Sequence, residues 1–297
     1  MVGSMKEMIY KQLKERAERY KNKFREWKYT GKIEGIAKVQ KPKNLVVGSP
    51  EKALHLKRDN EIPGTTFAVS VWNDIDEIAK ASIYYATKHL KIENVYIAGE
   101  VKKEIIAQLK TLVPHGYFYE GGYKKIEDVR GIAISCSDSR VLDNAIFNND
   151  SNDTVVINNA GNLFSKTALL TIRHYLENSK LDFIAVLAHS NCGAVNAACL
   201  GNLISPPEQQ LSTSENRTWR DQVGNDEREL QLMVLPIQLE VKYKARSVDE
   251  IKEVHYLKNA RGTMKKILEN IEDAKKLALF IGYHDLNTGE TEYYFYE

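Results

Sequence analysis

The stretch "GIAISCSDSRVLD", from Gly131 to Asp143, decides the fold of this chain. It begins with an apolar run of the kind that forms a strand buried on both faces of a sheet. The run ends in Cys136, Asp138 and Arg140. In an open parallel sheet the functional crevice lies at the carboxyl ends of the strands. The stretch therefore predicts a buried strand that holds a site at its end.

Strands and helices alternate on both sides of this stretch. Short β-rich runs occupy residues 44–47, 65–71, 94–99, 116–122, 131–135, 153–158, 182–189 and 277–286. Helical patterns occupy 5–29, 74–90, 101–112, 165–178, a segment from about 192, 229–243, 248–258 and 260–271. The alternation predicts an α/β fold with a parallel β-sheet core flanked by helices. A turn at "NTG" before 290–296 predicts a final return strand, and the polar stretch 202–228 predicts a surface loop.

Two parts of the chain share one pattern of apolar and polar positions at a nearly constant offset. The matched positions are 63–71 with 151–159, 91–100 with 180–189, and Gly48 with Cys136. Such an offset predicts a tandem pseudo-repeat of one α/β unit. The predicted domains are a helical arm (1–42), a first copy (43–128) and a second copy (129–297).

The composition is that of a globular protein with a sizeable core, since 43% of the 297 residues are hydrophobic. The net charge of +2 gives no reason to expect nucleic acid or an anionic membrane as a partner. No apolar run reaches the roughly 18 residues that span a bilayer. Three cysteines are too few for a disulfide framework, so we expect a reducing compartment, the cytoplasm. The amphipathic helix 5–29 needs a partner surface on this chain or on a second chain, as in a homodimer.

A second polar motif, His189-x-x-Cys192, follows the next strong strand. Together with Cys136 it offers two thiolates and an imidazole, a donor set that suits Zn²⁺. Three protein ligands leave a fourth position open, as in catalytic zinc sites. A metal there can lower the pKa of bound water to about 7.

Asp138 and Arg140 share one side of an extended segment, because alternate residues face the same way. Arg140 would keep Asp138 ionised and fix its orientation. The carboxylate could then orient a zinc-bound hydroxide, or it could bind the metal as a fourth ligand and close the site. Taken singly, the thiol, the ion pair and the histidine are ordinary core features, but their joint position at strand ends favours a site. Cys199 is expected to pack as a small apolar residue, and His174, His255 and His284 lack ligand spacing.

Four motifs resemble the signatures of the β-class carbonic anhydrase family, over about residues 131–293. They are "CSDSRV" (136–141), "NAGN" (159–162), "HSNCGAV" (189–195) and "GYHDLNTG" (282–289). The resemblance implies a four-stranded parallel core with an extra edge strand, and a zinc enzyme that interconverts CO₂ and bicarbonate through zinc-bound hydroxide. It also implies zinc ligation by Cys136, His189 and Cys192, with Asp138 and Arg140 as the catalytic dyad.

The sequence departs from the family pattern at two places. Asn158 stands where the family usually has Arg, and Ser151-Asn152-Asp153 replaces the usual Pro-Gly-Asp turn. Because these changes could alter the pocket wall, hydrolysis of COS or CS₂ at the same zinc site remains an alternative. A catalytically silent zinc-binding interaction module is the second alternative.

The first copy resembles the same family without its chemistry. At the positions matched to the five site residues stand Gly48, Pro50, Lys52, Glu100 and Lys103, and these cannot hold zinc. Enzymes of this family commonly pair two units, each site being completed by the neighbour. The resemblance therefore implies that residues 43–128 act as a built-in inactive partner, which makes one chain a pseudo-dimer.

Overall fold

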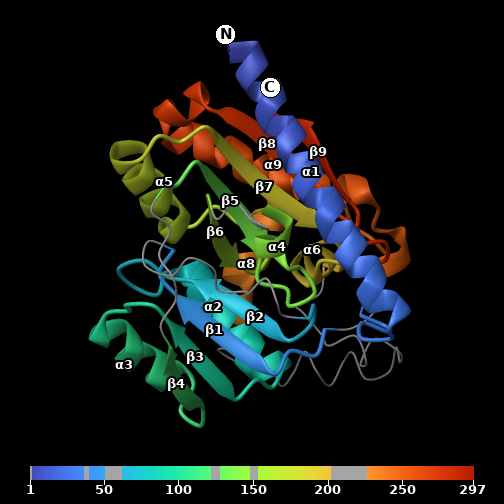
Figure 1. Ribbon diagram of the computed structural model, residues 1–297. Coiled ribbons are helices and arrows are strands. Elements are labelled where there is room, and N and C mark those ends of the chain that lie inside the picture. The colour runs from blue at the N-terminus through green and yellow to red at the C-terminus, as the bar shows by residue number, and fades with distance from the viewer. Residues whose placement is uncertain (1, 37–39, 51–61, 122–127, 148–152, 202–225) are drawn as a thin grey trace.

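The described part of the chain contains two β-sheets, which lie one above the other in Figure 1. The computed structural model describes residues 2–36, 40–50, 62–121, 128–147, 153–201 and 226–297. The first sheet has the order β2-β1-β3-β4 and is wholly parallel, with β1 (Asn44–Gly48), β2 (Thr66–Ser70), β3 (Asn94–Ala98) and β4 (Tyr117–Gly121). The second has the order β6-β5-β7-β8-β9, with β5 (Gly131–Cys136), β6 (Thr154–Asn159), β7 (Phe183–His189), β8 (Ala278–His284) and β9 (Thr291–Phe295). The predicted fold class, parallel sheets flanked by helices, is confirmed.

The two sheets repeat the same strand order, since β6-β5-β7-β8 follows β2-β1-β3-β4 strand for strand. Only the second sheet adds a return strand within the described part of the chain. There β9 pairs antiparallel with β8, as the "NTG" turn predicts. The carboxyl ends of β5, β6 and β7 meet at one edge of the second sheet, and this edge holds the candidate site.

The strand pairings correct one predicted match between the two parts. Val46 pairs with Ala68 in the first sheet, and Ala133 pairs with Val156 in the second. If Ala68 matches Val156, as predicted, then Val46 matches Ala133. The match of Gly48 with Cys136 is therefore wrong by one residue. The physical reason is that the segment from Val46 to Ala68 is one residue shorter than its counterpart, so that Ser49 corresponds to Cys136.

The helix α1 (Val2–Tyr29) lies along one face of the second sheet (Figure 1). Its buried apolar stripe packs against that face together with the short helix α4 (Asp143–Phe147); the stripe consists of Ile9, Leu13, Ala17, Tyr20, Phe24 and Trp27. Arg16 anchors the helix, because its guanidinium forms a bidentate pair with Asp153 at 2.9 and 2.8 Å and donates to the Phe147 carbonyl at 2.6 Å. The predicted arm is thus placed on the second half of its own chain.

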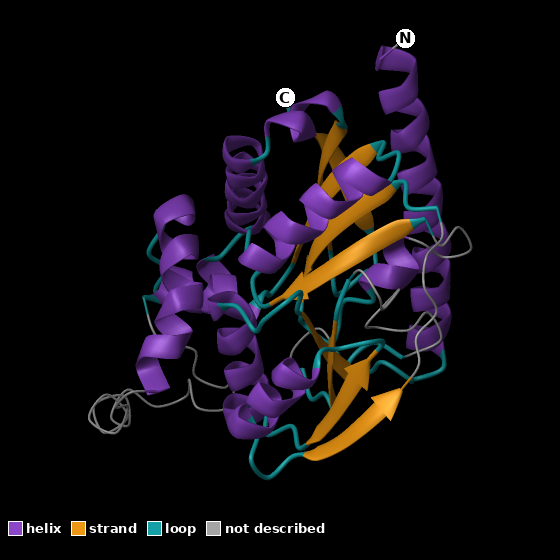
Figure 2. Cartoon of the chain, turned by 90° about the vertical axis from the view of Figure 1, so that its left-hand side faces the viewer, coloured by secondary structure: helices purple, strands orange, loops and turns teal. Residues whose placement is uncertain are grey.

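The remaining helices cover the other faces of the sheets (Figure 2). They are α2 (Glu77–Tyr84), continued by a π-helix η1 (Tyr85–His89), α3 (Lys103–Leu112), α5 (Lys166–Asn178), α6 (Gly193–Leu200), α8 (Asp226–Val241) and α9 (Glu253–Asn270), with short 3₁₀ turns η3 (Val248–Glu250) and η4 (Glu272–Lys276). One continuous apolar core runs through both sheets and these helices. The two halves therefore share a core.

The structure differs from the predicted helices at two places. The helices predicted at 248–258 and 260–271 are one helix, α9, preceded by the turn η3. No proline interrupts the segment, and Asn259 donates to the Gly161 carbonyl at 2.8 Å instead of capping a new helix. The helix α4 was not predicted, because five residues are too few to show a helical period. Most of the predicted loop 202–228 lies outside the described residues.

The halves meet along their edge strands β2 and β6 and along two helix ends. The Ala68 amide donates to the Ser137 carbonyl at 3.4 Å. Asp76 accepts a hydrogen bond from the Ala79 amide of α2 at 2.8 Å and, through its other oxygen, one from the Thr167 amide of α5 at 2.8 Å. One carboxylate thus serves the N-termini of two helices from different halves.

Candidate metal centre

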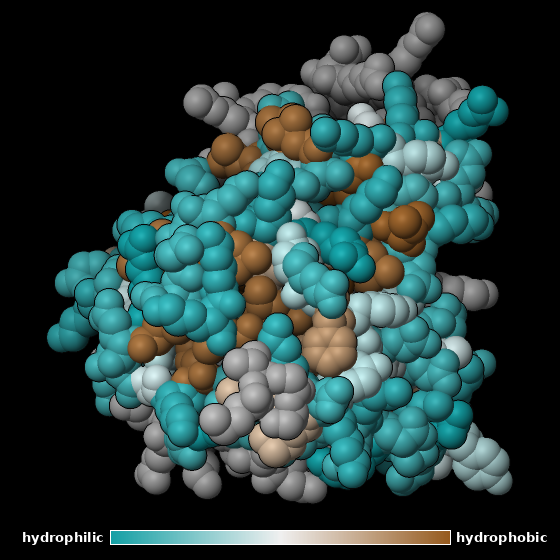
Figure 3. Space-filling view, turned by 90° about the horizontal axis from the view of Figure 1, so that it is seen from above, coloured by the Kyte–Doolittle hydropathy of each residue, from teal (hydrophilic) through white to brown (hydrophobic). Residues whose placement is uncertain are grey.

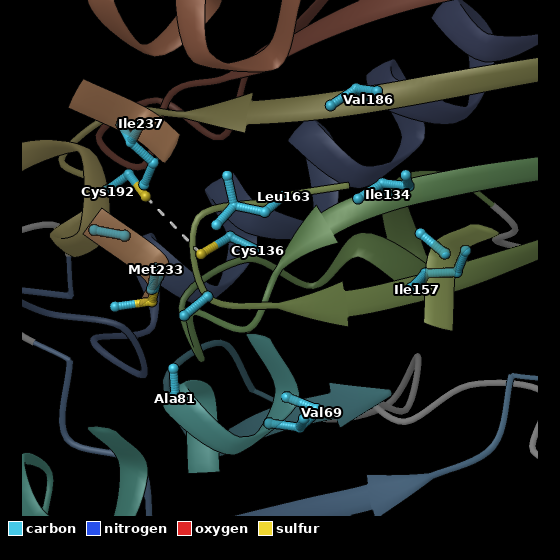
Figure 4. Packing of buried hydrophobic residues seen from close by; sticks show 14 of the residues in the cluster. Val69, Ala81, Ile134, Cys136, Ile157, Leu163, Val186, Cys192, Met233 and Ile237 are labelled. Carbon is cyan, nitrogen blue, oxygen red and sulfur yellow. Dashed lines mark hydrogen bonds between the residues drawn. The ribbon is translucent and has the colours of Figure 1, made fainter. Parts of the chain in front are cut away.

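Three metal-binding side chains converge where β5 and β7 end. Cys136 is the last residue of β5, His189 is the last residue of β7, and Cys192 is the N-cap of α6. Their donor atoms all lie within 4.8 Å of one another, and all three side chains are buried. The two sulfur atoms are 3.9 Å apart (Figure 4). The structure therefore brings together the three residues predicted as zinc ligands.

The donor set fits a zinc ion. His189 Nδ1 lies 2.9 Å from the Ser190 carbonyl oxygen, which can only accept, so Nδ1 donates and Nε2 is left as the free donor atom for a metal. Nε2 is buried and has no hydrogen-bond partner among the described residues. Two cysteine sulfurs and one imidazole nitrogen are soft-to-borderline ligands that zinc prefers.

The turn "NAGN" supports the Cys136 sulfur. The Gly161 amide donates to Cys136 Sγ at 3.3 Å, which favours the thiolate. Gly161 has φ +82, and a Cβ there would lie 2.9 Å from Ile237 Cδ1, so a side chain would disturb this turn. The hydrogen bond between the two thiols lowers the pKa of Cys136 and raises the pKa of Cys192. The first deprotonation of the pair thus places the charge on Cys136.

Asp138 and Arg140 form a buried ion pair beside these donors. Asp138 Oδ1 accepts from the Arg140 amide at 3.0 Å and from Arg140 Nε at 2.8 Å, and Oδ2 accepts from Nη2 at 2.5 Å. Arg140 Nη2 also donates to the Asn191 carbonyl at 2.9 Å. Burial opposes ionisation of the carboxyl, but the charge and hydrogen bonds of Arg140 outweigh it and hold the pKa of Asp138 well below its usual range.

The ion pair faces the metal-binding cluster. Asp138 Oδ2 lies 4.0 Å from His189 Nε2. The carboxylate is engaged by Arg140 through both oxygens, and it is not one of the three clustered donors. The residues predicted as the catalytic dyad are therefore placed next to the predicted ligands, with the carboxylate held on the arginine.

A small cavity of about 10 Å³, room for roughly one water-sized molecule, adjoins Cys136 and Asp138. Its other lining residues are Gln40, Phe67, Tyr85, Ala160, Gly193, Ala194 and Met233. Gln40, Phe67 and Tyr85 precede the second half of the chain, and sequence reasoning did not identify them. The ring centroids of Phe67 and Tyr85 are 6.0 Å apart. The only sequence signal for Phe67 was its place in a buried strand.

Gln40 links the first part of the chain to the ion pair. Its Nε2 donates to the Tyr85 hydroxyl at 3.4 Å, and its Oε1 accepts from the Ser139 amide at 3.4 Å. Ser139 lies between Asp138 and Arg140 in the sequence. The pocket is thus built from both halves.

The matched positions of the first half show no comparable cluster. Ser49 is buried just after β1, whereas Glu100 and Lys103 are exposed. With the one-residue correction Glu51 and Ala53 match Asp138 and Arg140, and they lie outside the described residues, as does Lys52. Within the described ranges, the second half holds the single group of three or more potential metal ligands. Cys199 is a buried free thiol in α6, apart from that group.

None of the helices in the described part of the chain is long and apolar enough to cross a bilayer. Figure 3 shows a face that is mostly hydrophilic, with hydrophobic side chains in small separate groups.

Comparison with known proteins points to one family. A family model described as carbonic anhydrase matches residues 131–291. Carbonic anhydrase 2 of Mycobacterium tuberculosis is 36% identical over 67 residues, which are 23% of this chain and 32% of that protein. A carbonic anhydrase of Mycolicibacterium smegmatis is 33% identical over 66 residues, 22% of this chain and 32% of that protein. The match thus covers about a third of each relative's length.

Solved structures of low sequence identity also match. The β-carbonic anhydrase CcaA is 20% identical, with a TM-score of 0.41, over 56% of this chain and 73% of that one. A carbonic anhydrase from Streptococcus mutans is 15% identical, with a TM-score of 0.35, over 65% of this chain and 99% of that one.

Proposed function

Because the chain belongs to the β-class carbonic anhydrase family, we propose that it is a zinc enzyme that reversibly hydrates CO₂ to bicarbonate and a proton. The observation that supports this most is the buried group of Cys136, His189 and Cys192 with the Asp138–Arg140 ion pair beside it. A silent binding module would not need an ionised carboxylate held 4.0 Å from a ligand nitrogen. Measurement of CO₂ hydration by the zinc-loaded protein tests the proposal.

Cys136, His189 and Cys192 would hold the zinc ion. Zinc, when bound, supplies a nucleophile at neutral pH by lowering the pKa of water to about 7. The Gly161 amide donates to Cys136 Sγ and so favours its thiolate form, and the Ser190 carbonyl fixes the tautomer of His189. The protein thus prepares the donors that such a metal requires.

Asp138 would orient the attacking group and hold its proton. Oδ2 is the oxygen closer to the ligand nitrogen of His189 and accepts one hydrogen bond from Arg140, while Oδ1 accepts two. Because its pKa lies well below the usual range, Asp138 is an acceptor throughout the neutral range. Arg140 acts as a positioning residue, since it fixes the carboxylate and is itself tied to the Asn191 carbonyl.

The pocket suits a small and weakly polar substrate. Phe67, Ala160, Ala194 and Met233 give it an apolar lining, and its size excludes bulk water. CO₂ is slim and carries no charge, so it loses little hydration when it enters such a pocket. The proton that leaves after the reaction passes to buffer.

We further propose that residues 43–128 are a degenerate copy of the second half and act as its inactive partner. Three observations support this: the shared strand order, the pocket residues Phe67 and Tyr85, and the contact between Ser70 and Asn158. Equivalent residues that touch each other lie near a two-fold axis. One chain would then complete its own site, and a homodimer would join through other surfaces.

The cytoplasm is the compartment that this chemistry favours. Cys136 and Cys192 have to stay reduced to bind a metal, although their sulfurs lie only 3.9 Å apart. Zinc analysis of protein purified with and without reductant tests whether Cys136 and Cys192 must be reduced for the metal to bind.

A further inference from the structure

Met233 closes the pocket from the side of α8. This helix packs on α2 of the first half and on α6 of the second, so it lies over the junction of the halves. The Met233 side chain is fully buried and lines the cavity together with Cys136 and Asp138. Figure 4 shows it between Ala81 of α2 and the Cys136–Cys192 pair.

Several other walls of the pocket have little freedom to move. Ala160, Gly193 and Ala194 have no side-chain torsion that could alter the cavity. The Tyr85 ring is held between Phe67, at a centroid distance of 6.0 Å, and His89, at 5.6 Å, and its hydroxyl accepts from Gln40. Tyr85 therefore cannot move without breaking these contacts.

Met233 is the adjustable wall. An unbranched thioether side chain has several rotatable bonds and adapts to the space around it. Its helix contains Pro236, which has no amide proton to bond the carbonyl one turn earlier, at Leu232. The turn that bears Met233 thus lacks one helical hydrogen bond, which eases small shifts of that residue.

We propose that Met233 sets the width of the substrate pocket and selects CO₂ over its sulfur-containing analogues. This inference rests on the proposed function, because it assigns specificity at the same site. The free space is about that of one water-sized molecule, so even CO₂ must press against the walls, and the larger sulfur atom of an analogue requires Met233 to move further. Removal of the Met233 Cγ, Sδ and Cε atoms opens the wall without touching the metal ligands or the ion pair.

The test uses two pairs of small molecules, CO₂ with COS and cyanate with thiocyanate. The members of each pair differ only in the replacement of one oxygen atom by sulfur. Zinc-loaded wild type, Met233→Ala, Met233→Leu and Leu235→Ala are compared after zinc analysis. The ratio of kcat/KM for COS to that for CO₂ reports on turnover. The ratio of the Kd values of cyanate and thiocyanate, measured by titration calorimetry, reports on pocket width without turnover.

Met233→Leu and Leu235→Ala are the controls. Leucine nearly conserves the volume of the Met233 side chain, and Leu235 is half exposed on the same helix.

Met233→Ala is expected to shift both ratios toward the sulfur-containing molecule by about tenfold, whereas both controls stay within about twofold of wild type. Met233→Val, which removes fewer atoms, should shift them in the same direction and replaces the alanine variant if that protein does not fold. Ratios within about twofold of wild type in a zinc-loaded, folded variant overturn the inference, as does a wild type that binds neither anion. If the anion ratio shifts but wild type hydrates no CO₂, the proposed function and the selection of CO₂ fail, and only the role of Met233 in setting the pocket width stands.

Discussion

The backbone amide of Asn158 donates a 2.8 Å hydrogen bond to the Ser70 hydroxyl, and these two residues occupy matching positions in the edge strands of the two sheets. The Asn158 side chain also reaches the Cys136 carbonyl at 3.5 Å and Asp143 Oδ2 at 2.5 Å. A contact between the halves is therefore one residue away from a predicted zinc ligand. The junction and the site are therefore parts of one structure.

Replacement of Asp76 by Ala is expected to lower the free energy of unfolding by about 2 kcal/mol, because one buried carboxylate caps two helices. Chemical denaturation monitored by circular dichroism measures the change. The matched control is Asp74→Ala, which removes an exposed pair with Lys166 and should have little effect. Equal effects of the two substitutions would show that Asp76 does not join the halves.

Replacement of Arg16 by Ala should loosen α1 on the second half and lower the free energy of unfolding by about 2–3 kcal/mol, because Asp153 and the Phe147 carbonyl lose the hydrogen bonds that Arg16 donates. Limited proteolysis within α1 should accelerate in parallel. Lys21→Ala, which removes a surface pair with Glu290, is the control and should behave like wild type. A wild-type stability of the Arg16 variant would contradict the anchoring role.

Replacement of Gln40 by Ala should lower kcat/KM for CO₂ roughly tenfold and leave the zinc content unchanged. The reason is that Gln40 ties Ser139, between Asp138 and Arg140, to Tyr85 of the first half. Tyr117→Phe, at an exposed position of the first half, serves as the control. If the Gln40 variant turns over CO₂ like the control, the first half does not complete the site.

Replacement of Arg140 by Met should change how stability depends on pH. In wild type the pKa of Asp138 lies below its unfolded value, so its ionisation stabilises the native state above about pH 4 and this contribution is lost as the pH falls through the folded value. Without Arg140, burial dominates and raises the pKa of Asp138 in the folded state above its value in the unfolded state. Ionisation of Asp138 would then destabilise the native state, the reverse of its effect in wild type.

The Arg140→Met protein should therefore be about 3–5 kcal/mol less stable than wild type near pH 7, and this deficit should shrink as the pH is lowered toward 5. Denaturation midpoints of both proteins over that range give the comparison. A deficit that is constant with pH would mean that Asp138 is not the group that Arg140 keeps ionised.

The sequence predicted the elements that have a strong local pattern. The apolar run before Cys136, the stripe on residues 5–29 and the turn before β9 each specify their own structure. The predicted ligands Cys136, His189 and Cys192 were also found together, because parallel strands bring their carboxyl ends to one edge. Family membership could likewise be inferred from short motifs.

Features that depend on distant parts of the chain could not be predicted in this way. Gln40, Phe67 and Tyr85 reach the pocket only through the packing of one half on the other, and no local pattern marks them. In the sequence, Met233 is one of several apolar residues spaced as in an amphipathic helix, so nothing distinguishes it as a pocket residue. Gly48 was matched to Cys136 in place of Ser49 because one constant offset was applied to both strands. The first part has one residue fewer between these strands than the second part, and a constant offset does not detect this.

The most direct test is stopped-flow measurement of CO₂ hydration by wild type and Asp138→Asn, each with its zinc content determined, across about pH 6.5–9. We expect one zinc per chain in both proteins, hydration of CO₂ by wild type, and a loss of at least about a hundredfold in the hydration rate of the variant. A wild type that holds one zinc and hydrates no CO₂ anywhere in this range would contradict the proposed function.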